Sequence, residues 1–163
     1  MHSLIRSLES VIIDSSYIVK HLERIRNSIN SDPELAIGST KELIETVLKT
    51  ILEDAGEDIR NKDIPQLLRS VQKVLGLLPD SADSFKKGTD TIKRLLSNLG
   101  QIVICIDELR NLYGTGHGKT KLDTGIEAHH ARLVVGAGAT LATFLMELHE
   151  GIGSGVPKPK TKK

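Results

Sequence analysis

The sequence predicts an all-α fold, a single bundle of about five helices followed by a disordered basic C-terminal tail. Apolar residues recur at three- and four-residue steps through most of the chain, and no alternation of apolar and polar residues indicates a sheet. Two Phe, two Tyr and no Trp occur among the 163 residues, so the core must be aliphatic. This length suits one domain with a core of its own.

The first predicted helix covers residues 4–29, where apolar residues keep a helical period. Residues 31–34, Ser-Asp-Pro-Glu, are typical of a helix start, with a capping oxygen, a proline in the first turn and an acid near the positive end of the dipole. The second helix is therefore expected to run from there to Ala55, with Gly56 ending it. A third helix is expected over residues 65–77.

Residues 81–113 have a mostly helical pattern, but Gly88 and Gly100 interrupt it, so they form either two segments or one kinked helix. A loop rich in Gly, Thr and Lys is expected over residues 114–125. The last predicted helix covers residues 126–150. Small residues on or near one side of it allow another helix to approach closely: Gly136, Gly138, Ala139 and Ala142.

Residues 1–150 are expected to form the domain, and residues 151–163 its disordered basic tail. The tail carries four of the 22 basic residues and none of the 21 acidic ones, so the rest holds 18 basic against 21 acidic residues, a net charge of −3. Such a body lacks the broad basic surface of proteins that coat duplex nucleic acid. With so few aromatic residues it also lacks platforms for base stacking, so any RNA site must be small.

Cysteine use and hydropathy predict a cytoplasmic protein that does not enter a membrane. Cys105 is the one cysteine, which excludes an internal disulfide and fits a reducing compartment, and its apolar neighbours predict that it is buried. The first ten residues do not resemble a signal peptide. The longest apolar run, residues 133–146, is too short to span a bilayer.

Two fragments imitate a nucleotide-binding enzyme. Residues 114–120 resemble a phosphate-binding loop, and residues 102–108 resemble an apolar strand that ends in an acidic pair. The loop motif requires a glycine where Tyr113 stands, and the chain has no alternation of strands and helices to build a parallel sheet. We therefore expect no nucleotide and no other cofactor.

The most informative stretch holds Arg110, Asn111 and His117. The bare Arg-to-His spacing is expected about once by chance in a chain of this composition, so its context must carry the interpretation. Seven residues fall about 20° short of two helical turns, which would place Arg110 and His117 on one face of a continuous helix. Gly114 and Gly116 favour a break instead, with His117 on a loop just past the helix end.

Three stretches resemble the abortive-infection C-terminal family of the HEPN superfamily: DPELAIGSTKELIETVLKTIL at residues 32–52, LRNLYGTGHG at residues 109–118 and HARLVVGAGATLATFL at residues 130–145. The resemblance implies a helical bundle that dimerises, with an active motif of an arginine, a polar residue, a spacer and a histidine. Carried over, Arg110, Asn111 and His117 occupy those positions, and their spacer is long for the superfamily.

Such a motif can cut RNA without a metal. A base removes the proton of a 2′-hydroxyl, the oxygen attacks the adjacent phosphorus, and an acid protonates the departing 5′-oxygen, which leaves a 2′,3′-cyclic phosphate. Imidazole suits both tasks because its ordinary pKa, about 6.5, keeps both of its forms available. A symmetric dimer supplies two His117 rings. Arg110 would hold the phosphate, and Asn111 would orient the phosphate or the histidine.

Four further residues are candidates for substrate binding or support. Glu45 stands four residues from both Lys41 and Lys49, a spacing that surface ion pairs explain, although the resemblance suggests that it reaches Arg110 or His117 across the bundle. Lys119 adds positive charge beside His117 or is simply a solvated loop lysine.

His130 and Arg132 belong to a matched stretch and are expected to support phosphate binding or the dimer contact. A metal site is not expected, because His129 and His130, as helix neighbours, point about 100° apart and cannot readily share one ion.

Taken together, these features predict a metal-independent endoribonuclease of an anti-phage abortive-infection or toxin-type system, acting on RNA as a homodimer. The alternative is a non-catalytic helical module that dimerises or binds a sensor or regulatory partner protein within such a system.

Overall fold

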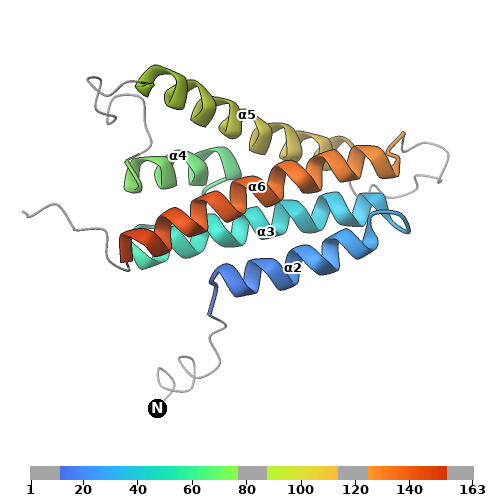
Figure 1. Ribbon diagram of the computed structural model, residues 1–163, viewed down its shortest axis with the longest axis horizontal. Coiled ribbons are helices and arrows are strands. Elements are labelled where there is room, and N and C mark those ends of the chain that lie inside the picture. Colours follow the sequence, from blue (N-terminus) through green and yellow to red (C-terminus); the bar gives the residue numbers. More distant parts are fainter. Residues whose placement is uncertain (1–11, 77–87, 114–124, 154–163) are drawn as a thin grey trace, which may run out of the picture.

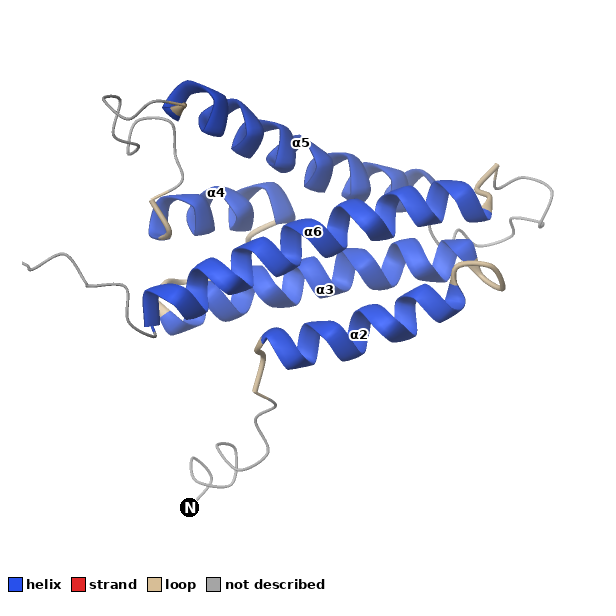
Figure 2. Ribbon diagram, in the orientation of Figure 1, coloured by secondary structure: helices blue, strands red, loops and turns tan. Residues whose placement is uncertain are grey.

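A computed structural model describes residues 12–76, 88–113 and 125–153, and all the regular structure within these ranges is helical. Figures 1 and 2 show five helices that lie side by side in a bundle. They are α2 (Ser15–Ser28), α3 (Pro33–Asp54), α4 (Ile64–Val74), α5 (Thr89–Tyr113) and α6 (Ala128–Gly153). The predicted all-α class and the number of helices are confirmed.

Helix α3 is the centre of the bundle, because it contacts α2, α4, α5 and α6, and α6 most extensively. Its buried residues recur every three or four positions over its whole length, so α3 presents apolar side chains to all four neighbours. Within the described residues the buried hydrophobic core consists only of Ile, Leu, Val, Ala and Met, as the sequence predicts.

The first predicted helix is not continuous over its described residues, where α2 begins at Ser15. Asp14 is the N-cap of α2 and accepts a hydrogen bond from the Tyr17 N–H at 2.9 Å, while residues 12–14 are not helical. Both the N–H and the hydroxyl of Ser15 donate to the Glu150 carboxylate of α6, at 2.8 and 2.7 Å. A helix running unbroken through residues 12–14 was therefore a wrong prediction, because these polar contacts fix a helix start inside an apolar repeat; residues 1–11 lie outside the described part.

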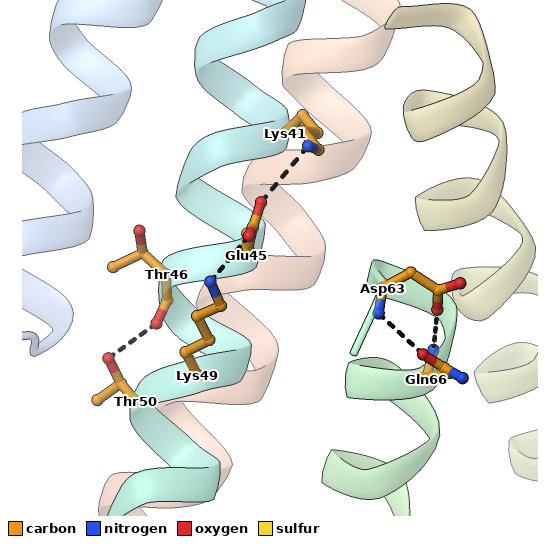
Figure 3. Close-up of polar contacts among 7 residues, drawn as sticks. All are labelled: Lys41, Glu45, Thr46, Lys49, Thr50, Asp63 and Gln66. Atoms are coloured by element: carbon orange, nitrogen blue, oxygen red, sulfur yellow. Dashed lines mark hydrogen bonds and ion pairs between the residues drawn. The ribbon is translucent and has the colours of Figure 1, made fainter. Parts of the chain in front are cut away.

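Helices α3 and α4 begin and end where polar and glycine signals predict. The side chain of Asp32 caps α3, and Gly56, at a φ of +74°, follows its end. At the start of α4, Asp63 and Gln66 form a reciprocal capping box, which Figure 3 shows. Helix α4 ends at Val74, three residues before the predicted end, and Gly76 follows with a φ of +70°.

Helix α5 is continuous from Thr89 through Gly100 to Tyr113, so a break at Gly100 was a wrong prediction. Gly88 precedes the helix with a φ of +88°, and residues 81–87 of the predicted stretch lie outside the described part. Gly100 is buried, and a Cβ there would lie 3.5 Å from Leu68 and 3.7 Å from Gln72 of α4. This glycine therefore serves close packing of α4 on α5. Cys105, by contrast, is exposed, which corrects the prediction that it is buried.

Close approach of α6 is confirmed at Gly138, where a Cβ would overlap Thr40 Cγ2 of α3 and lie 3.3 Å from Ile44 Cδ1. Ala139 and Ala142 are also buried, whereas Gly136 is exposed. Helix α6 extends to Gly153, three residues into the predicted tail, and residues 154–163 lie outside the described part.

Helix α6 also has the length and hydropathy of a membrane span over Ala128–Gly151, which the apolar run alone did not reveal. Half of an apolar 18-residue stretch of this helix is buried within the bundle, where α6 packs mainly against α3. A core helix passes the same test of length and composition, and its packing on α3 is the role that the structure gives to α6.

Candidate functional site

The predicted motif lies at the end of α5. Arg110 and Asn111 belong to its last turn, and their side chains lie outside the described part of the structure. His117 and Lys119 fall in residues 114–124, which are not described. The mutual geometry of Arg110, Asn111 and His117 therefore stays a prediction.

Two other parts of the bundle lie at the same end as the last turn of α5, which carries Arg110 and Asn111. Figure 1 shows the last turn of α5, the first turns of α6 and the connection between α2 and α3 together at that end. We call this region the motif end. Because His130 and Arg132 lie in the first turns of α6, the fold brings both to the end that carries Arg110 and Asn111.

His130 caps the start of α6. Its Nδ1 accepts the backbone N–H of Glu127 at 3.0 Å, which leaves the proton of the neutral ring on Nε2. The ring of His129 lies beside it, with centroids 4.0 Å apart, and the Nδ1 of His129 is 3.3 Å from the Glu127 carboxylate. His130 therefore has a structural role through Nδ1, and its exposed ring can meet a ligand only through Nε2.

Arg132 connects α6 to the end of α2. Its Nη2 donates to Asn30 Oδ1 at 3.3 Å, and Arg132 and Asn30 line a cleft of about 310 Å³ together with Arg26. Sequence reasoning singled out Arg132 but missed Arg26 and Asn30. No local signal could have found them, because their relation to Arg132 exists only once α2 and α6 pack together.

Glu45 lies about halfway along α3 and forms ion pairs within its own helix. Its carboxylate is 2.9 Å from Lys49 Nζ and 3.4 Å from Lys41 Nζ, as Figure 3 shows. The hydrogen bond from Lys49 is the main cause that lowers the pKa of Glu45 below its ordinary value; the charges of both lysines lower it further, and partial burial opposes them. The predicted ion pairs are confirmed, and a contact with Arg110 or His117 stays a prediction.

Glu34, in the first turn of α3 at the motif end, was assigned from the sequence only to the helix dipole. Among the described residues its Oε1 is the buried side-chain oxygen that lacks a hydrogen-bond partner. A carboxylate oxygen that is removed from water without a hydrogen-bond partner lowers the stability of the folded chain.

Metal-ligating side chains do not gather in the described ranges, where no group of three or more His, Cys, Asp or Glu residues could hold an ion. The adjacent His129 and His130 engage Glu127 through their Nδ1 atoms, one its carboxylate and the other its backbone N–H. The described side chains at the motif end include those of Arg132, His130, His129 and Asn30, together with the carboxylates of Glu34 and Glu127.

Comparison with known families gives a match that covers most of the chain. The family model Abi_C, described as a HEPN-like domain, matches residues 16–149, which include nearly all of the five helices. Comparisons with curated proteins and with solved structures found no match.

Proposed function

This chain belongs to the Abi_C family of HEPN-like domains, and from that membership we propose that it is a metal-independent endoribonuclease of abortive-infection defence. The observation that carries the proposal is the position of Arg110 and Asn111 in the last turn of α5, at the end of the bundle where α6 presents His130 and Arg132. The proposed site therefore combines Arg110 and Asn111 of α5 with His130 and Arg132 of α6.

Each motif residue has a separate task in the proposed reaction. His117 acts on the protons of the 2′-hydroxyl and of the departing 5′-oxygen, Arg110 binds the phosphate and stabilises its growing charge, and Asn111 orients the group that it bonds. His130 and Arg132 contact the substrate beside the scissile phosphate. The product ends are a 2′,3′-cyclic phosphate and a 5′-hydroxyl.

A homodimer completes the site, because one chain brings one His117 while the reaction needs a base and an acid at once. The outer face of α6 supports this arrangement. Leu133, which is 74% exposed, and Phe144, which is 37% exposed, lie three turns apart on that face with the exposed Thr140 between them. This exposed face, which begins at the motif end with Leu133, suits a contact with a second copy.

A non-catalytic module that dimerises or binds a sensor protein remains the second candidate. The observation that favours it is the net negative charge of residues 1–150, which gives RNA little general attraction.

The two candidates differ in a cleavage assay of the full chain with a mixed pool of single-stranded RNA in EDTA. We expect the native chain to cut the pool and to leave cyclic phosphate ends, while His117→Ala and Arg110→Ala abolish cutting and keep the dimer intact by light scattering. His21→Ala is the matched control, since His21 stacks on Tyr17 in α2 and lies outside the motif. Cutting that persists in both motif variants would reject Arg110 and His117 as the site, and a native chain that leaves the pool uncut would favour the non-catalytic module.

A further inference from the structure

A cleft between the end of α2 and the start of α6 has the chemistry of a phosphate site. Its volume is about 310 Å³, and it is lined by Arg26, Ile29, Asn30, Arg132, Val135 and Gly136. The lining therefore contains two arginines and no acidic side chain. Neither guanidinium forms an ion pair with a described residue.

Arg26 and Arg132 both line the cleft, and their guanidinium groups can donate hydrogen bonds to an anion. Asn30 Oδ1 holds one nitrogen of Arg132 at 3.3 Å, which restrains the side chain and leaves its other N–H groups to donate. Arg26 faces the same space from α2. A planar guanidinium donates two parallel hydrogen bonds to phosphate oxygens, so two of them can clamp one phosphodiester.

The other lining residues leave room for a nucleotide. Ile29 and Val135 are buried and form an apolar floor, on which a sugar or a base can rest. Gly136 is exposed, and a Cβ on it would meet no heavy atom within 4 Å. A ligand can therefore come close to the backbone of α6 at this point.

We propose that this cleft binds a phosphodiester of the RNA strand next to the one that is cut. The end of α2 and the start of α6, which line the cleft, lie at the same end of the bundle as the last turn of α5 (Figure 1), so one RNA strand is proposed to reach both. This inference rests on the proposed ribonuclease function for its substrate, but the binding that it predicts can be measured without any cleavage.

The test measures binding of a fluorescein-labelled 12-nucleotide single-stranded RNA by fluorescence anisotropy, with the full chain carrying His117→Ala so that the probe stays intact. We expect Arg26→Gln and Arg132→Gln each to raise Kd about tenfold and to reduce the slope of log K against log salt by about 0.7, the share of one phosphate contact in a single strand.

Arg69→Gln is the matched control, because Arg69 belongs to a separate basic groove on α4 with Lys62 and Lys73. We expect it to change Kd less than twofold. Gly136→Leu keeps every charge but fills the cleft with a side chain, so we expect it to weaken binding as strongly as the arginine variants do. Thermal unfolding of each variant confirms that the bundle is intact, and light scattering confirms an unchanged dimer, because Gly136 lies one turn from Leu133 on α6.

The inference is overturned if Arg69→Gln weakens binding as much as Arg26→Gln, which would mean general attraction to positive charge, or if Gly136→Leu leaves Kd unchanged. These outcomes are distinct from failure of the ribonuclease. A native chain that binds RNA through the cleft without cutting it rejects the nuclease alone, and a chain that cuts RNA without using the cleft rejects this inference alone.

Discussion

Glu34 is a partly buried residue with one carboxylate oxygen that is shielded from water. Its Oε1 lies in the first turn of α3 without a hydrogen-bond partner. Because a neutral amide costs less to bury than a carboxylate, we expect Glu34→Gln to raise the free energy of unfolding by about 1 kcal/mol at pH 7, measured by urea denaturation. A loss of stability in this variant would contradict the assignment of an unsatisfied oxygen.

Glu45 differs from Glu34 because two lysines, Lys41 and Lys49, pair with its carboxylate and stabilise its charge. Its folded-state pKa is lowered from 4.5, so the stabilisation is complete above that value and is lost as the pH falls through the folded-state pKa. We expect Glu45→Gln to cost less than about 1 kcal/mol at pH 7, since water screens the partly exposed lysines, and to cost nothing at low pH.

The measurement for Glu45 is urea denaturation across pH 3 to pH 7, with the exposed neighbour Glu42→Gln as the control. A difference between native chain and Glu45→Gln that grows as the pH falls would show that the sign is wrong. An activity loss in Glu45→Gln at unchanged stability would instead support the predicted reach of Glu45 toward the motif.

At the scale of elements, alanine substitutions at two glycines of α6 are expected to change the unfolding free energy in opposite directions. Gly138→Ala places a Cβ against Thr40 and Ile44 of α3, so we expect a loss of about 1 to 3 kcal/mol of unfolding free energy through overpacking. Gly136→Ala meets open space in the same helix and should gain up to about 1 kcal/mol from helix propensity. Equal effects in thermal unfolding would contradict the packing assigned to Gly138.

The elements could be predicted from the sequence wherever a local signal decides them. Asp32 with Pro33 and Asp63 with Gln66 mark helix starts because a side chain satisfies N–H groups within the same turn. The start of α2 was missed since part of its cap is Glu150, 135 positions away. Gly100 looked like a break because its role, contact with α4, is invisible in a periodic pattern.

At the scale of the whole molecule, the candidate site also has one part that the sequence predicts and one part that only long-range packing creates. Arg110 and Asn111 were found through a resemblance of three stretches, and the fold then places His130 and Arg132 at the same end. The cleft of Arg26, Asn30 and Arg132 could not be predicted, because it arises only from the packing of α2 on α6. Asn30 and Arg132 are 102 positions apart, so no local sequence pattern indicates their contact.

Dimerisation through the outer face of α6 is the prediction that concerns the assembled molecule. Leu133→Asp puts a charge into the proposed apolar contact, so we expect a monomer in light scattering and loss of RNA cleavage at unchanged helicity. Leu95→Asp is the matched control, because Leu95 is a 58% exposed leucine on α5. A Leu133→Asp chain that stays dimeric and active would exclude this face as the interface.

The claim of a composite site is tested most directly by the initial rate of RNA cleavage as a function of chain concentration, measured in EDTA from nanomolar to micromolar protein. The account predicts a rate that rises with the square of concentration below the dimer dissociation constant, becomes linear above it, and is absent in His117→Ala at every concentration. A rate that stays proportional to concentration where the chain is monomeric, or that survives His117→Ala, would contradict it.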